Sequence, residues 1–460
     1  MEKRDLPKAP SFWQTLGPSF IFLGLSLGSG ELIMWPYLTA NFGLGIIWGA
    51  LLGITFQFFM NMEIVRYSLV YGESVFVGFW RLWRYWSVWF ILSTFIAWSL
   101  PGFSAAGSQI LDEMFGLGNE TLVAVGLLLL TGLILSLGKT LYRTMEVFQK
   151  SIIVLGTPLI VILVLLLTKT VHWQAAAWGL LGKGEGYFLL PAGISLMSFL
   201  GAFAYAGAGG NLNLAQSFYV KEKGYGMGRF AQKIKSLFAR GKSQISLEGK
   251  TFPRDTENLE EFSHWWRAVN LEHGSIFWFL GFLTIMLLSI LAFALVHDTS
   301  GIHLEGISFL FSEAKMIGSQ TFALMGTIFL LAVFLMLFST QTGVLESTSR
   351  IIAENVFLLF KKEEKSKINL SQGFYLALWG QIIFGIVLLL LGFREPRFLL
   401  TLAAVINAVC MFVHLGLTFF LNRQFMPKKL RPAFYRVFIL SIAFVFFGVF
   451  SFLTFWQGIR

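Results

Sequence analysis

Long apolar runs dominate the chain, and short polar segments separate them. A membrane-spanning helix needs about 20 predominantly apolar residues, so each run of this length predicts one transmembrane helix. The pattern predicts eleven such helices, and we expect the unusually long eighth one to extend past the bilayer. Their ranges in chain order are 15–41, 43–70, 86–111, 120–138, 145–168, 188–220, 271–297, 319–358, 371–393, 397–422 and 435–456.

Two of these segments carry glycine-rich interruptions near their middle. The first span contains Gly28-Ser29-Gly30-Glu31, and the sixth contains Ala206-Gly207-Ala208-Gly209-Gly210-Asn211. Glycine weakens a helix, and uncovered peptide groups survive at mid-membrane depth only inside protein or around a cavity. Paired breaks of this kind point to the substrate site of a transporter. We therefore predict that helices one and six are broken, near 28–31 and 205–211, and that the two breaks face each other.

Composition supports a polytopic membrane protein. Hydrophobic residues make up 56% of the chain and charged residues only 13%, whereas a soluble domain carries about 25% charged residues. The single cysteine, Cys410, excludes an internal disulfide and a thiolate metal site. Neither a His-Glu-x-x-His motif nor a phosphate loop with its lysine occurs. We therefore expect no enzymatic activity and no cofactor.

The basic residues set the expected orientation, because Lys and Arg concentrate in cytoplasmic loops. A cytoplasmic N-terminus leaves only six of the 35 basic residues outside, and with eleven spans the C-terminus then lies outside. Topology thus accounts for the net charge of +10, so we expect no nucleic-acid partner. The sequence predicts a monomeric, multi-pass protein of the cell membrane (inner or plasma membrane), whose partners are the lipid bilayer and a small cation or small-molecule substrate. The six outer residues are Lys169, Lys183, Lys315, Arg394, Arg397 and Arg460.

Several motifs resemble those of the Nramp divalent-metal transporters. The stretch from Leu16-Gly17-Pro18 through Gly28-Ser29-Gly30-Glu31 to Gly43-Leu44-Gly45-Ile46-Ile47-Trp48 resembles the Gly-Pro opening, the Asp-Pro-Gly-Asn break and the Gly-Tyr-x-Leu-Leu-Trp entry of that family. Ala208-Gly209-Gly210-Asn211-Leu212 is similar to its Met-Pro-His-Asn-Leu, and Ser339-Thr340-Gln341-Thr342-Gly343 to its Ser-Ser-Thr-x-Thr-Gly. The resemblance extends over nearly the whole chain.

The resemblance implies an all-α fold of the leucine-transporter type, with an inverted repeat of five plus five helices. On this basis residues 1–170 form the first repeat with spans one to five. Residues 171–425 form the second, with spans six to ten and a basic cytoplasmic loop at 221–267. Residues 426–460 add a peripheral eleventh helix.

The usual ligand motifs of the family are missing, which marks the chain as a divergent member. The family's metal ligands are a first-span Asp and Asn and a sixth-span Met, and the matching positions here hold Gly28, Glu31 and Ala208. The positions tied to proton handling hold Gly210 and Phe103. Without the soft thioether ligand we expect a hard cation such as Mg²⁺ or Mn²⁺, poor discrimination against Ca²⁺, and no proton coupling through the family's usual residues.

Glu31 is the principal candidate ligand, because a carboxylate at mid-membrane depth is costly unless it has a role. Its alternative role is to cap the half-helix that begins at Leu32, and Asn211 has the same alternative before the second half-helix. A small organic solute such as an amino acid or amine is the alternative substrate, because the small residues would leave room for it. A non-transporting membrane receptor or scaffold is the third alternative. The candidate substrate or ion site comprises Gly28, Ser29, Gly30, Glu31, Ala208, Gly209, Gly210, Asn211 and Asn213, with Glu31 and Asn211 as metal ligands.

Other polar residues within the spans have simpler expected roles. Glu346 with Arg350, and Glu63 with Arg66, share helix faces and should pair near the cytoplasmic side. We expect single polar residues inside spans, Gln109 and Asn407, to form interhelical hydrogen bonds. His414 is expected to be a packed residue, and His273 to flank the inner side.

Overall fold

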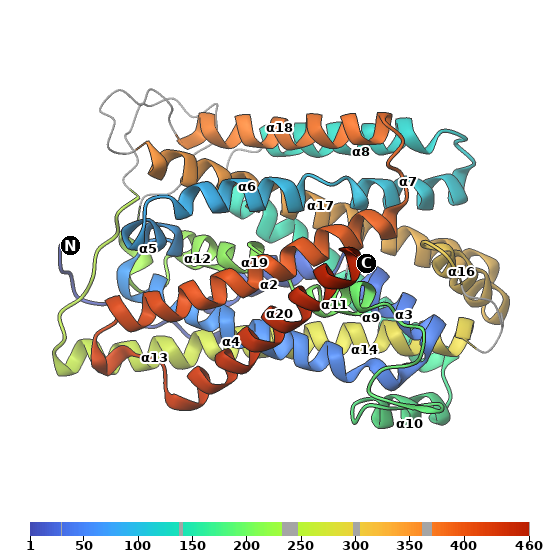
Figure 1. Ribbon diagram of the computed structural model, residues 1–460, viewed down its shortest axis with the longest axis horizontal. Helices are drawn as coiled ribbons and strands as arrows, with labels where there is room; N and C mark the ends of the chain where they lie inside the picture. The colour runs from blue at the N-terminus through green and yellow to red at the C-terminus, as the bar shows by residue number, and fades with distance from the viewer. Residues whose placement is uncertain (29, 138–140, 232–246, 298–303, 361–369, 460) are drawn as a thin grey trace.

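The computed structural model describes the chain except for residues 29, 138–140, 232–246, 298–303, 361–369 and 460. The described residues form a bundle of helices with one short hairpin (Figure 1). Ten helical segments in this part of the chain are long and apolar enough to cross a membrane, and the sixth predicted span consists of two shorter helices. The predicted all-α polytopic architecture is confirmed.

The helices of the first five spans follow the predicted ranges closely. The third span is interrupted after Trp98 and resumes at Gly102, because Pro101 lacks the N–H that would continue the helix. Between the second and third spans lies the short helix α5 (Val75–Leu82). The spans are built from α2 (Pro18–Ser26), η1 (Gly30–Met34), α3 (Trp35–Phe42), η2 (Leu44–Ile46), α4 (Trp48–Tyr71), α6 (Trp86–Trp98), α7 (Gly102–Phe115), α8 (Glu120–Leu137) and α9 (Leu141–Leu167).

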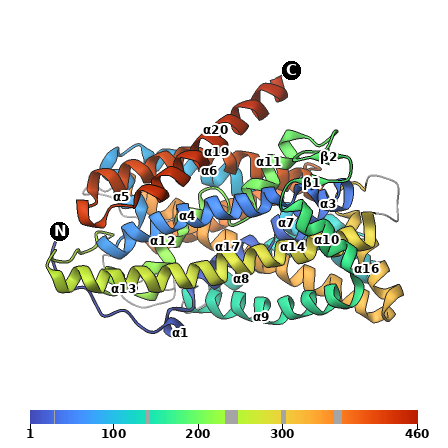
Figure 2. The same cartoon turned by 90° about the horizontal axis from the view of Figure 1, so that it is seen from below.

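The second half of the chain supplies the other spans. α17 has 37 residues, which at about 1.5 Å per residue is longer than the roughly 30 Å hydrocarbon core, as expected for a helix that extends past the bilayer. The C-terminal half of α20 projects from the bundle (Figure 2). These spans are α11 (Leu196–Ala204), α12 (Leu212–Lys223), α13 (Thr256–His273), η4 (Gly274–Leu280), α14 (Gly281–Ala292), η5 (Phe293–His297), α17 (Ala323–Leu359), α18 (Leu370–Leu390), α19 (Pro396–Phe425) and α20 (Phe434–Ile459).

The seventh span differs from the prediction. It starts at Thr256 and continues without interruption to His297, a length of 42 residues, whereas the apolar pattern placed its start at 271. The Asp255 side chain caps the helix by accepting a hydrogen bond from the backbone N–H of Asn258 (2.9 Å). The last part of the predicted loop 221–267 is therefore helical. The first turns of this helix are polar, so apolar runs alone do not predict them.

Both breaks have a local cause in the sequence. α2 ends at Ser26, and η1, a π-helical segment, begins at Gly30; Ser29 lies outside the described residues. In the sixth span, Gly209 (φ 76°) and Gly210 (φ 51°) adopt left-handed backbone that other residues rarely reach. Such segments end one helix and allow the next to start in a new direction, so the predicted breaks are confirmed.

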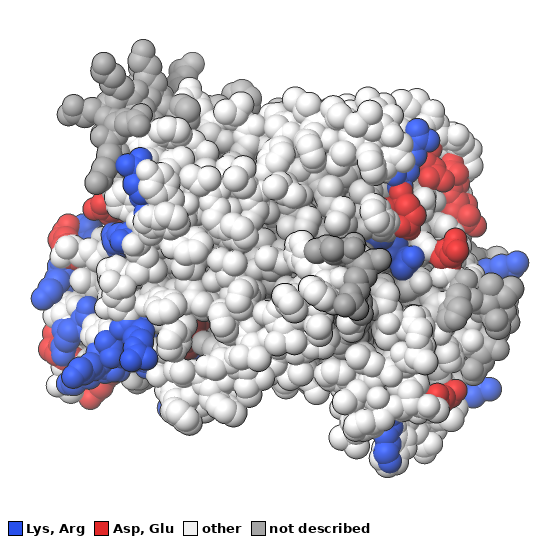
Figure 3. Space-filling view, viewed as in Figure 1, with Lys and Arg blue, Asp and Glu red and all other residues white. Residues whose placement is uncertain are grey.

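On the face shown in Figure 3, charged side chains gather at the two ends of the bundle, and a largely uncharged belt separates them. We call the end with residues 1–10, α5 and the start of α13 the N-terminal end. The opposite end, the hairpin end, carries α10 (Thr170–Gly179), α16 (Ser308–Gln320) and the antiparallel hairpin of β1 (Lys183–Gly184) and β2 (Tyr187–Phe188) (Figure 1). An uncharged belt of this kind is typical of a protein that spans a bilayer.

Candidate functional site

The two breaks lie against each other inside the bundle. Gly30 packs on the backbone of Tyr205, which directly follows α11, and a Cβ atom at Gly30 would lie 1.6 Å from the Tyr205 carbonyl oxygen. Real Cβ atoms essentially never come within 3.0 Å of another atom. Only glycine therefore allows the two backbones to approach this closely, and the predicted meeting of the breaks is confirmed.

Side chains from neighbouring helices satisfy the unwound backbone of the sixth span. Gln57 on α4 donates to the carbonyl oxygen of Ala204 (3.0 Å) and accepts from the N–H of Gly209 (3.0 Å). The Nε2 atom of His414 on α19 hydrogen-bonds the carbonyl oxygen of Gly210 (3.0 Å). His414 is thus buried as expected but also supports the break, and Gln57 is a functional candidate that the sequence analysis missed.

Glu31 lies in η1 and is completely buried. Its carboxylate accepts hydrogen bonds from the hydroxyl of Ser26 on α2 (2.8 Å) and from the hydroxyl of Thr284 on α14. Within the described residues no Lys, Arg or backbone N–H bonds this carboxylate, so the role of a helix cap finds no support. The carboxylate faces the seventh span, and a Cβ at Gly281 would lie 3.7 Å from its Oε1 atom.

Asn211 points elsewhere. Its amide nitrogen donates to Ser93 (2.8 Å) and Thr94 (2.9 Å) on α6, and its side chain makes no capping hydrogen bond to α12. Glu31 bonds only the first and seventh spans, whereas Asn211 bonds the third. The described contacts therefore do not bring together the two side chains that the sequence analysis assigned as metal ligands.

The small residues of both breaks are closely packed. Ala208 is 1% exposed, and a Cβ added at three of the candidate glycines would lie within 3.0 Å of a neighbouring side chain. The room expected around these glycines is therefore filled by neighbouring side chains. The contacting side chains are Thr340 on α17 at Gly28, Tyr205 at Gly209 and Asn407 on α19 at Gly210.

A group of buried polar atoms beside the sixth-span break lacks hydrogen-bond partners in the described part of the chain. Both side-chain polar atoms of Asn213 belong to this group. The Tyr205 ring stacks on Trp98 (centroids 5.5 Å apart) and its hydroxyl accepts from Asn407 (3.1 Å), which confirms the interhelical role expected for Asn407. The other unpartnered atoms are Trp98 Nε1, Asn211 Oδ1 and Asn407 Oδ1.

Buried ion pairs occupy the half of the bundle nearer the N-terminal end. Arg66 and Glu63 pair at 2.7 Å, and Arg350 contacts both Glu346 and Glu222. Both predicted pairs are confirmed, and Glu222 on α12 is an additional member that joins the sixth and eighth spans. Buried pairs of this kind fix helices in register but add little net stability.

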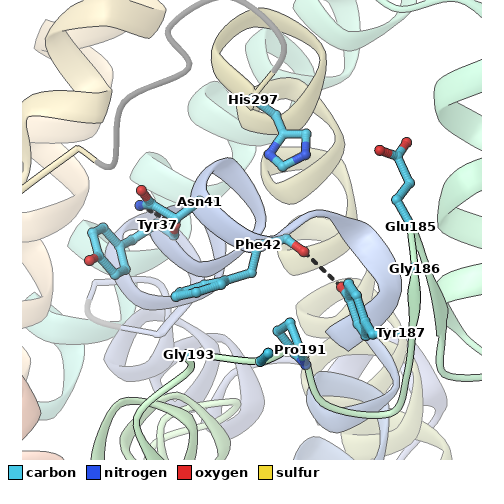
Figure 4. Close-up of a pocket in the computed structure, with 10 residues that line it drawn as sticks. Tyr37, Asn41, Phe42, Glu185, Gly186, Tyr187, Pro191, Gly193 and His297 are labelled. Atoms are coloured by element: carbon cyan, nitrogen blue, oxygen red, sulfur yellow. Dashed lines mark hydrogen bonds between the residues drawn. The ribbon is translucent and has the colours of Figure 1, made fainter.

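A cavity of about 600 Å³ opens at the hairpin end. Figure 4 shows Glu185 and His297 on different sides of it, and the Tyr187 hydroxyl donating to the carbonyl oxygen of Phe42 (2.8 Å). Burial raises the pKa of Tyr187 to about 12, so the phenol keeps the proton that it donates. The hydrogen bond ties the hairpin to the end of α3, and the cavity lies beside this contact.

No family model and no curated protein sequence matches the chain. Among solved structures, a histidine-to-alanine mutant of a manganese transporter from Eremococcus coleocola is similar over 98% of this chain and 89% of its own, with 13% identity and a TM-score of 0.72. A glutamate-to-alanine mutant of the same transporter gives a TM-score of 0.70 at the same identity and coverage.

A second kind of transporter shares the architecture more distantly. Mhp1, a nucleobase-cation-symport-1 family transporter solved in a closed conformation with bromovinylhydantoin bound, matches 97% of this chain and 91% of its own, with 12% identity and a TM-score of 0.54. At such low identity these likenesses establish the fold alone. The chain is therefore an all-α, multi-pass membrane protein with the leucine-transporter fold, whose first and sixth spans are broken where they meet.

Proposed function

We propose that this protein is a secondary transporter that carries a hard divalent cation, such as Mg²⁺ or Mn²⁺, through a site at Glu31. The observation that carries the proposal is a fully buried carboxylate that bonds only hydroxyl groups in the described structure. A charge at mid-membrane depth costs at least about 2.5–3.5 kcal/mol. Two hydroxyl donors offset part of that cost, and a bound cation would supply the missing counter-charge.

The donor set favours hard cations. The Glu31 carboxylate and the hydroxyl oxygens of Ser26 and Thr284 are oxygen ligands, the type that Mg²⁺ and Ca²⁺ prefer, and Mg²⁺ commonly keeps several of its waters. Position 208 holds alanine, so no thioether is supplied there to favour soft metals. We expect transport of Mg²⁺ or Mn²⁺ with weak discrimination against Ca²⁺.

In this proposal, relative movement of the two halves exposes Glu31 alternately to the two sides of the membrane. It sits between α2 and α3 and bonds the seventh span, so rocking of these elements would change its surroundings. In this proposal residues 1–170 and 171–425 are the inverted repeats, 426–460 is peripheral, and the N-terminal end faces the cytoplasm. Alternating access of this kind is usual for transporters with broken helices.

Uptake by reconstituted protein tests the proposal directly. Proteoliposomes loaded with a Mn²⁺-sensitive dye should take up Mn²⁺ with the wild-type protein. Glu31→Gln keeps the shape but removes the charge, so uptake per folded molecule should fall at least tenfold, equivalent to about 1.4 kcal/mol of binding.

Glu313→Gln is the matched control, because Glu313 is also a buried acid (1% exposed) but lies on α16 at the hairpin end. It should transport at the wild-type rate. A folded Glu31→Gln protein with wild-type uptake would remove the basis of the cation proposal.

A polar organic solute is the second candidate substrate. It is supported by the buried polar atoms of Trp98, Asn211, Asn213 and Asn407, beside the sixth-span break, that lack hydrogen-bond partners among the described residues. A solute with several donors and acceptors would satisfy them, because buried polar groups are normally hydrogen-bonded. A thermal-shift screen of divalent cations against amino acids and amines separates the candidates. Stabilisation by an organic solute that survives in Glu31→Gln but is lost in Asn213→Leu would favour this second candidate.

A further inference from the structure

The turn between α19 and α20 carries a group of exposed basic side chains, and the chain contains no Asp or Glu after Glu395. On the face shown in Figure 3, basic side chains gather over this turn, at the N-terminal end of the bundle where the uncharged belt stops. We call the four exposed basic residues the turn cations. They are Arg423, Lys428, Lys429 and Arg431.

Hydrogen bonds to the second span hold the backbone of this turn. The carbonyl oxygen of Leu430 accepts from the buried guanidinium of Arg66 (3.1 Å), and that of Phe425 accepts from the hydroxyl of Tyr71 (2.5 Å). Arg66 and Tyr71 both belong to α4. The turn is therefore attached at two points, one on each side of the two lysines, to a helix of the bundle core.

The turn is also rigid in itself. Met426 and Leu430 are each only 2% exposed, so their side chains anchor the turn in the protein. Pro427 and Pro432 lie on either side of the short helix η6 (Lys428–Leu430), and proline fixes the backbone angle φ. The turn thus presents its cations in a preformed arrangement, which reduces the ordering cost of binding a ligand.

Arg436, in the first turns of α20, shows what a protein-paired cation looks like in this region. It is 5% exposed. Its guanidinium pairs with Glu63 (3.5 Å), donates to the side-chain oxygen of Asn270 (2.6 Å) and lies over the ring of Trp266 (4.9 Å). By contrast, none of the turn cations forms an ion pair within the described part of the chain.

The acidic side chains of the neighbouring segments already have partners. Glu63 on α4 pairs with Arg66 (2.7 Å) as well as with Arg436. Glu73, between α4 and α5, accepts from the guanidinium of Arg81 (3.0 Å). The positive charge of the turn cations is therefore left uncompensated by these acids, and it is available to an anionic ligand.

Large exposed aromatic side chains lie directly beside the turn cations. Three belong to the first turns of α20, and a fourth lies near the end of α19. Exposed aromatic rings at the end of a transmembrane helix are typical of the interface between hydrocarbon and headgroups, and basic residues at this level attract anionic lipids. The aromatic residues are Phe434 (83% exposed), Tyr435 (54%), Phe438 (57%) and Phe420 (61%).

We propose that the turn cations bind the phosphate of an anionic phospholipid whose acyl chains lie along the aromatic side chains at the start of α20. Lys and Arg donate charge-assisted hydrogen bonds to phosphate oxygens, and the apolar rings contact the chains, which a free phosphate ion lacks. Because Leu430 is bonded to Arg66, the bound lipid stabilises the packing of α19 and α20 on α4. The inference goes beyond the proposed transport function and does not depend on it.

Binding of a fluorescent phosphatidylglycerol to the full-length protein in detergent micelles tests the inference. The wild type should bind phosphatidylglycerol at least about tenfold more tightly than phosphatidylcholine, whose own ammonium group offsets its phosphate. The preference should shrink at about 0.5 M NaCl, because salt screens exposed charges.

The triple variant Arg423→Gln/Lys428→Gln/Lys429→Gln should bind phosphatidylglycerol at least about tenfold more weakly, because each basic residue near an anionic headgroup adds several-fold to the affinity. It retains Arg431, whose Nε atom donates to the carbonyl oxygen of Met426 (3.1 Å) and supports the shape of the turn. Lys428→Arg/Lys429→Arg keeps both charges and should bind as the wild type does.

Lys3→Gln/Lys8→Gln/Arg84→Gln is the matched control, because it removes the same charge from exposed positions at the same end of the bundle. It should bind phosphatidylglycerol within about twofold of the wild type. Equal affinity of the wild type for the two lipids, wild-type binding by the triple variant, or an equal loss in the control would overturn the inference. So would displacement of the labelled lipid by inorganic phosphate as effectively as by unlabelled phosphatidylglycerol. The comparison of the two lipids uses the wild type, so it decides the question even where a variant fails to fold.

Discussion

The contact between the two breaks makes a sharp prediction for Gly30→Ala. The added Cβ atom would lie 1.6 Å from the Tyr205 carbonyl oxygen, against a practical minimum of 3.0 Å, so the two backbones must separate by at least about 1.4 Å. Tyr205 cannot retreat easily, because it stacks on Trp98 and bonds Asn407. Overpacking typically costs about 1–3 kcal/mol of folding free energy. Because the clash here is with a backbone carbonyl, which cannot rotate away, we expect Gly30→Ala to lose about 3 kcal/mol. This corresponds to on the order of a hundredfold decrease in the ratio of folded to unfolded protein.

Thermal unfolding in detergent, followed by size-exclusion chromatography, measures this loss. Gly126→Ala is the matched control: Gly126 lies exposed in α8, and a Cβ there would meet nothing within 4 Å. Alanine is favoured over glycine inside a helix by roughly 0.5–1 kcal/mol, so this variant should unfold at the wild-type temperature or above. A Gly30→Ala protein as stable as the Gly126→Ala protein would refute the close contact of the breaks.

Three further substitutions test the remaining contacts. Thr284→Val should weaken Mn²⁺ uptake and lower the unfolding temperature, because a buried hydrogen bond to Glu31 is lost at a cost of about 1–3 kcal/mol; wild-type values for both would contradict its role. Arg66→Gln breaks a buried ion pair and should cost about 3–5 kcal/mol, whereas Arg4→Gln, in an exposed pair, should leave the unfolding temperature unchanged. Burial raises the pKa of Glu313 well above its usual 4.5. The stabilisation that comes from this protonated carboxyl is therefore complete below about pH 4.5 and is lost as the pH rises through the pKa of the folded state. Melting temperatures between about pH 5 and 8 should therefore decline in the wild type and decline less in Glu313→Gln.

The apolar pattern determined the class of protein and the number and order of its spans. Hydrophobic runs of bilayer length can satisfy their backbone groups in lipid only as helices, so their count carries over directly into structure. Gly209 and Gly210 marked the sixth-span break for an equally local reason, the positive φ angles that glycine tolerates. The apolar pattern did not predict the start of the seventh span, because the residues from Thr256 to Asn270 are mostly polar. A helix made of such residues contains no apolar run that would reveal it.

Only the tertiary structure decided which side chains meet. Glu31 and Asn211 occupy similar places in their spans, yet one turns to Thr284 on the seventh span and the other to Ser93 on the third. That choice depends on helix rotation and on contacts more than 100 residues apart in sequence, which a single sequence does not encode in any local pattern. The same reason hid the hydrogen bonds that join Ser19 to Glu272 and His273. Each is an ordinary polar residue near a span end, and only the packing of α2 against α13 removes water and leaves the three groups to bond one another.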